Sequence, residues 1–91
     1  MIKEVSVQVR GLVQGVFFRA FTKEQALALG IKGHVRNMPD GSVSIVAQGT
    51  EEALKKFLEK IRQGPPGAVV ERVDVEWGLP LKKYEAFEIL K

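Results

Sequence analysis

The stretch of sequence with the clearest chemical potential is GLVQGVFFRA, residues 11–20, in which an arginine follows two glycines and an apolar run. Arg19 falls at the start of a segment with helical character, where free amides and the helix dipole already create positive charge. A cation is unfavourable there unless an anion binds, and Gly15 lets the backbone curl so that several amides converge. These features indicate a site for a phosphoryl group. The alternative is an arginine that pairs with a nearby carboxylate or lies on the surface.

A second residue of chemical interest is Asn37, the only asparagine of the chain, which opens the turn sequence N-M-P-D-G. Its side chain offers both a hydrogen-bond donor and an acceptor. Asparagine is also common where a strand enters a turn, because it tolerates left-handed backbone and bonds to its own main chain. The residue pattern alone leaves both roles open.

The elements that position these residues follow from the spacing of apolar side chains. Alternation of apolar and polar residues predicts strands, and apolar residues three and four positions apart predict helices. The elements expected in chain order are a strand at 3–10, a loop at 11–17, a helix at 18–29, strands at 31–37 and from 43, a helix from 51 to the turn G-P-P-G at 64–67, a strand at 69–77 and a short fifth strand at 84–90.

This β-α-β-β-α-β order predicts an α+β fold, the ferredoxin-like βαββαβ sandwich. We expect an antiparallel sheet of four to five strands with both helices on one face. In that fold the strands at 3–10 and from 43 are central neighbours. The end of the strand at 31–37 then lies within reach of the loop at 11–17, so Arg19 and Asn37 are expected to share a site.

The composition excludes several classes of protein. The chain has 91 residues, no cysteine and one histidine, which excludes disulfide scaffolds, thiol catalysis and metal sites built on cysteine or several histidines. The net charge of +3 suits an anionic small ligand and is too small and dispersed to indicate nucleic-acid binding.

The start MIKEVSVQVR lacks the pattern of a signal peptide, and no apolar run is long enough to span a membrane. We therefore expect one domain over residues 1–91, monomeric and cytoplasmic, without a cofactor. Scarce asparagine and frequent lysine and glutamate point to a thermophilic source.

Two long motifs carry a resemblance to a known family. Residues 9–19 read V-x-G-x-V-Q-G-V-x-F-R, and residues 33–43 read G-H-V-R-N-x-x-D-G-x-V in a block that ends at Gly49. Together they resemble the two signatures of the acylphosphatase family, whose size and ferredoxin-like fold match the element order above. Two positions depart from the family pattern: His34 stands where a large aromatic is usual, and Ser44 where an acidic residue is common.

The resemblance implies hydrolysis of acyl phosphates to a carboxylate and inorganic phosphate. It assigns catalysis to Arg19, which with the loop amides would bind the phosphoryl group, and to Asn37, which would orient the attacking water. The phosphate-binding loop that it implies consists of Gln14, Gly15, Val16, Phe17, Phe18 and Arg19. Within this loop, the apolar residues at 16–18 are expected to anchor it to the core, with at least one of them projecting outward.

The chemistry of an acyl phosphate agrees with the lack of an acid catalyst in this sequence. The leaving carboxylate has a pKa of about 4 and departs as a stable anion, so no general acid is needed. What remains is positioning and charge stabilisation, which dominate the catalysis of phosphoryl transfer. The proton of the attacking water is expected to pass to a phosphoryl oxygen of the substrate.

Several residues are expected to have no chemical role. His34 should point away from the core as a solvated or stacking side chain, and Asp40 should act as a turn former rather than a base. Trp77 should lie on the buried face of its strand, and Lys82 and Lys83 should be surface charges.

Two other functions compete with the enzyme. The same anion site could serve a non-enzymatic module that senses a phosphorylated ligand or regulates a partner. RNA binding on this fold needs aromatic residues on the two central strands, whereas VSVQV and SVSIVAQ contain none. A phosphate site without turnover would distinguish the binding module from the enzyme.

Overall fold

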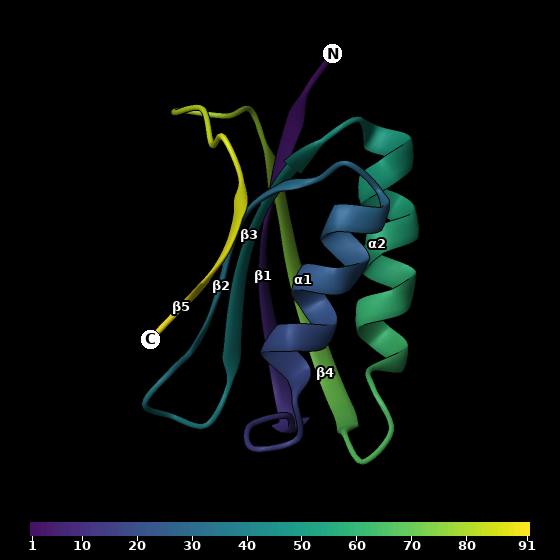
Figure 1. Ribbon diagram of the computed structural model, residues 1–91, viewed down its shortest axis with the longest axis vertical. Coiled ribbons are helices and arrows are strands. Elements are labelled where there is room, and N and C mark those ends of the chain that lie inside the picture. Colours follow the sequence, from purple (N-terminus) through teal and green to yellow (C-terminus); the bar gives the residue numbers. More distant parts are fainter.

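The computed structural model describes residues 1–91 and contains two helices and five strands. The strands are β1 (Lys3–Leu12), β2 (Lys32–Asn37), β3 (Val43–Gly49), β4 (Val69–Gly78) and β5 (Phe87–Leu90), and the helices are α1 (Phe18–Ala28) and α2 (Glu51–Gln63). The strands form one sheet in the order β4-β1-β3-β2-β5, and both helices cover the same face of it (Figure 1). The ferredoxin-like α+β fold expected from the element order is confirmed. Neither helix is long and apolar enough to cross a membrane.

The core lies between this face of the sheet and the two helices. Val5, Val7 and Val9 of β1 are buried, and they pair directly with alternate residues of β3. Residues opposite each other in antiparallel strands point to the same face, so these pairs form one apolar layer. The stripe on α2 that covers this layer consists of Leu54, Phe57, Leu58 and Ile61. α2 begins as expected, with the Thr50 side chain accepting a hydrogen bond from the Ala53 amide.

The sheet differs from the expected antiparallel arrangement at one edge. β5 pairs with β2 in parallel, while the other three strand pairings are antiparallel. The segment 79–86 carries the chain from β4, at one edge, across the end of the sheet to the other edge (Figure 1). Because β5 then enters from the same end as β2, the two strands run in the same direction.

β1 extends to Leu12, beyond the predicted end of this strand at residue 10. Its pairing with β4 shifts register between Arg10 and Gly11, as in a β-bulge. Gly11 has φ of 129°, and a Cβ at this position would collide with the Val69 carbonyl oxygen of β4. Only glycine therefore fits where the end of β1 turns toward α1.

Trp77 lies on the expected face of its strand but is not buried there. Its strand position is opposite Val5, on the core-facing side, yet 41% of the residue is exposed. β4 is an edge strand, so a side chain as large as an indole extends past the cover of the helices. The alternation in sequence predicts the correct face but not how much of that face is covered.

Candidate active site

A cavity of about 320 Å³ lies where the loop before α1 meets the ends of β2 and β5. Both residues assigned to catalysis from sequence, Arg19 and Asn37, line it. The complete lining is Val13, Gly15, Phe17, Phe18, Arg19, Ala20, Asn37 and Ile89. The fold thus brings together two polar side chains that come from separate sequence motifs.

The loop before α1 presents free backbone amides at this cavity. Gly15 and Phe17 both have left-handed backbone, with φ of 74° and 62°, which curls the loop into the start of the helix. No side chain caps α1, its first turn contains no acidic residue, and residues 13–20 donate none of the backbone hydrogen bonds outside helices and strands. The positive end of the helix is therefore open to an anion.

Arg19 lies in the first turn of α1 and is half-buried. Its Nη1 donates a hydrogen bond of 3.0 Å to the carbonyl oxygen of Leu90 in β5. It forms no ion pair with a carboxylate, so the alternative interpretation of Arg19 as half of a salt bridge does not describe this structure. The guanidinium is held by a neutral group and retains its charge for a ligand.

Asn37 is the last residue of β2, opposite Val43 of β3. Its Oδ1 atom is buried and has no hydrogen-bond partner within the protein. Buried polar atoms in folded proteins are nearly always paired, so an unpaired acceptor beside a cavity marks a place for a donor such as water.

Gln14 joins the loop to the β2–β3 hairpin. Its Nε2 donates hydrogen bonds of 2.8 Å to the carbonyl oxygens of both Met38 and Ser42. Both amide hydrogens are used in fixing the loop beside Asn37, and the residue does not line the cavity. Val16 does not line it either and packs against the core instead. Of the predicted loop, Gly15, Phe17, Phe18 and Arg19 face the cavity.

The three apolar residues of the loop divide as expected between core and solvent. Phe18 is buried and Val16 packs against the core, whereas Phe17 projects outward with 84% of its surface exposed. Phe17 is also the only residue other than glycine with positive φ. Nothing in the sequence marks this residue for left-handed backbone.

Asp40 holds the hairpin turn, as its sequence context predicts. Its carboxylate accepts hydrogen bonds from the Ser42 backbone amide and hydroxyl at 3.0 and 2.6 Å, and from Arg10 at 3.1 Å. The two bonds from Ser42, followed by the bond from Arg10, lower the pKa of Asp40 from 3.8 to about 2. The carboxylate is therefore ionised near neutral pH and a very weak base.

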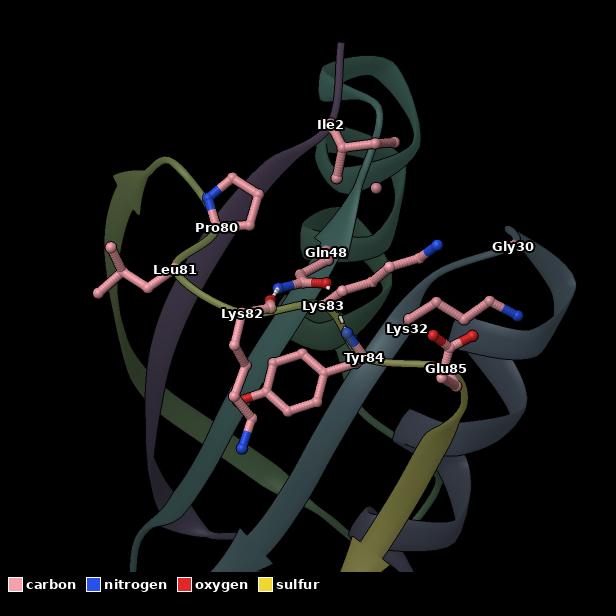
Figure 2. A pocket seen from close by; sticks show the side chains of 11 residues that line it. Ile2, Gly30, Lys32, Gln48, Pro80, Leu81, Lys82, Lys83, Tyr84 and Glu85 are labelled. Carbon is pink, nitrogen blue, oxygen red and sulfur yellow. Dashed lines mark hydrogen bonds between the residues drawn. The ribbon is translucent and has the colours of Figure 1, made fainter.

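A larger cavity, of about 560 Å³, lies at the other end of the sheet under segment 79–86 (Figure 2). The buried polar side chain on its floor, Gln48, is already satisfied: it donates to the Glu4 carboxylate and the Lys82 carbonyl, and it accepts from the Tyr84 amide. These bonds tie the segment to β3. Volume alone would favour this cavity, but both amide hydrogens of its buried polar group are already used within the protein.

His34 packs beside this segment as a stacking residue. Its ring meets that of Tyr84 edge-on, with 5.4 Å between ring centroids. Burial lowers the pKa of His34, and the charges of Arg36 and Lys82 lower it further. A neutral imidazole against an aromatic ring is a packing arrangement, as expected for this position.

Sequence reasoning missed the contributions of Val13, Ala20 and β5. Val13 continues the apolar alternation of β1, and this signal could have placed it in the site. Ile89 and the Leu90 carbonyl reach the cavity from the opposite end of the chain, and no local pattern indicates that contact.

The fold and the cavity together define a small ferredoxin-like α+β protein with a candidate anion site at the start of a helix. The family model described as acylphosphatase matches residues 5–89, and the chain belongs to the acylphosphatase family, whose members are hydrolases acting on acid anhydrides. The resemblance seen in the two motifs is thus confirmed.

The relatives that the chain resembles include thermophilic bacterial proteins. It is 51% identical over 88 residues to the acylphosphatase of Thermotoga maritima, covering 97% of both chains. The crystal structure of acylphosphatase from Bacillus subtilis is 35% identical, covers both chains completely and superposes with a TM-score of 0.95. A structure of an acylphosphatase from Coxiella burnetii is 34% identical with a TM-score of 0.92, and covers 98% of this chain and 93% of that one.

Proposed function

We propose that the protein hydrolyses acyl phosphates in the cavity between the loop before α1 and the end of β2. The observation that carries this proposal is that Arg19 and Asn37 line the same cavity, and that the Oδ1 atom of Asn37 is buried without a hydrogen-bond partner. The first supplies a cation for the phosphoryl group, and the second supplies an acceptor for a water molecule.

The phosphoryl oxygens bind to the Arg19 guanidinium and to the free amides at the start of α1. Fixed donors aimed at these oxygens stabilise the charge that redistributes over them in the transition state. The Leu90 carbonyl positions the guanidinium by engaging one of its N–H groups. The remaining N–H groups of Arg19 donate to the phosphoryl group, and the planar guanidinium can bind two phosphoryl oxygens at once.

The attacking water donates one hydrogen to Asn37 Oδ1, which orients its lone pair toward phosphorus. The new phosphorus–oxygen bond forms as the bond to the acyl oxygen breaks, and the electron pair leaves with the carboxylate. The proton of the water passes to a phosphoryl oxygen, so the products are a carboxylate and dihydrogen phosphate. An amide is too weak a base to take this proton, and Asn37 acts by orientation.

The test is hydrolysis of benzoyl phosphate by the wild type, Arg19→Ala and Asn37→Ala, with chelator present. We expect fast wild-type turnover that both substitutions abolish. Asn37→Ala should lower turnover far more than it weakens binding of inorganic phosphate. If phosphate affinity collapsed instead, Asn37 would be a phosphate ligand rather than a residue that orients water.

A folded wild-type protein that binds phosphate without hydrolysing any acyl phosphate would refute the proposal and favour the binding module. The proposal takes the chain to act alone, as a monomeric cytoplasmic enzyme on a small-molecule substrate without a cofactor, as its composition predicts. Sedimentation of the purified protein tests the monomeric state directly.

A further inference from the structure

The cavity that holds Arg19 and Asn37 has walls that are otherwise apolar. Two of the apolar residues, Phe17 from the loop and Ile89 from β5, are exposed to solvent, over 84% and 41% of their surface. They come from opposite ends of the chain and line the same cavity. An exposed apolar lining of this kind is typical of a ligand site.

Folding does not explain the placement of Phe17. The residue is absent from the hydrophobic core and from the layer packed against it, and its ring contacts no other aromatic ring. Its left-handed backbone, with φ of 62°, is unfavourable for a bulky side chain. The protein therefore holds a large apolar side chain in solvent, in a strained conformation, beside its candidate catalytic arginine. Such strain clusters at functional sites.

We propose that Phe17 and Ile89 form the binding surface for the acyl group and select acyl phosphates with an aromatic or branched apolar acyl group over acetyl phosphate. This inference rests on the proposed function, since it assumes that the phosphoryl group binds at Arg19. Neither residue carries a charge or a side-chain donor that could recognise a polar acyl group. Burial of an apolar acyl group against both side chains strengthens binding in proportion to the area covered.

The experiment compares kcat/KM for benzoyl phosphate and acetyl phosphate in the wild type, Phe17→Asn, Ile89→Ser and the control Leu27→Asn. Asparagine tolerates left-handed backbone, so Phe17→Asn removes the ring and keeps the loop conformation. Ile89→Ser tests the other wall without changing the loop. Leu27 is exposed on α1, does not line the cavity and controls for the loss of a surface apolar residue.

We expect the wild type to prefer benzoyl phosphate by about tenfold or more, the equivalent of 1.4 kcal/mol. Phe17→Asn and Ile89→Ser should each reduce this preference by about threefold to tenfold, mainly through KM for benzoyl phosphate, while Leu27→Asn leaves the ratio unchanged. An effect of a substitution on the phosphoryl site is common to both substrates, so it cancels in the ratio of the two kcat/KM values.

The outcomes separate the two proposals. If the wild type hydrolyses both substrates and neither variant changes the ratio, the acyl surface is refuted and the proposed function stands. If the wild type hydrolyses neither substrate, both proposals fail. Circular dichroism of each variant excludes unfolding as the cause of a change.

Discussion

Replacement of Arg19 by lysine should abolish most activity while leaving the fold intact. In the structure the guanidinium gives one N–H to the Leu90 carbonyl. Under the proposed function, its other N–H groups bind the phosphoryl oxygens. A lysine ammonium is a point charge that cannot hold the carbonyl and two phosphoryl oxygens in one plane. Loss of two charge-assisted hydrogen bonds, each about 1.5–3 kcal/mol, totals about 3–6 kcal/mol. This corresponds to about 10²- to 10⁴-fold in kcat/KM.

The assay is the initial rate of benzoyl phosphate hydrolysis, with thermal unfolding of the same samples to check the fold. Arg36→Lys is the matched control, because Arg36 is exposed on β2 and does not line the cavity. We expect wild-type rates from the control. An Arg19→Lys protein that is folded and retains kcat/KM within about threefold of wild type would show that a simple positive charge suffices, and the geometric argument would fail.

Three further predictions concern stability. Gly33 has φ of 142°, and a Cβ there would collide with the Val46 carbonyl, so Gly33→Ala should lower the free energy of unfolding in urea by at least about 2 kcal/mol. Gly78→Ala, where a Cβ meets nothing within 4 Å, should change it by less than about 0.5 kcal/mol, and equal losses would contradict the steric reason. Gln14→Ala leaves two hairpin carbonyls without their donor and should lower the free energy of unfolding by about 1–3 kcal/mol. It should also remove much of the turnover. Unchanged turnover would show that Gln14 does not position the site. The pKa of Asp40 in the folded protein, about 2, lies below its ordinary value of 3.8. The ionised Asp40 therefore stabilises the fold fully above about pH 4, and this stabilisation is lost as pH falls toward 2. The difference in stability between wild type and Asp40→Asn should therefore shrink as pH falls from about 4 through 2. A difference independent of pH would refute this assignment.

The layout of the elements was predictable because its signals are local. The alternation of Val5, Val7 and Val9 places β1, and the spacing of apolar residues after Thr50 places α2. Arg19 and Asn37 were predicted to share a site because the order of elements brings the end of β2 to the loop before α1. Each element is recognised from a few consecutive residues, and the shared site then follows from the order of the elements and the known geometry of helices and strands.

The remaining features depend on contacts that no local pattern encodes. The bond from Arg19 to the Leu90 carbonyl joins residues 71 positions apart, and the strand that supplies the carbonyl has only four residues. A strand so short shows too little alternation to fix its partner or direction. The sequence does not predict the left-handed backbone of Phe17 either, because the residues that usually indicate such a conformation are glycine and asparagine.

The bond between Arg19 and Leu90 also sets the time at which the site is completed during synthesis. α1 and its arginine leave the ribosome early, whereas β5 is made last of all the strands and must add to the edge of β2 in parallel. Parallel pairing of distant segments is slow because it closes a long loop. Until residue 90 has emerged and docked, Arg19 lacks its positioning carbonyl. The same strand supplies Phe87, which packs against Phe57 of α2 in the core, so completion of the core and positioning of Arg19 both depend on β5.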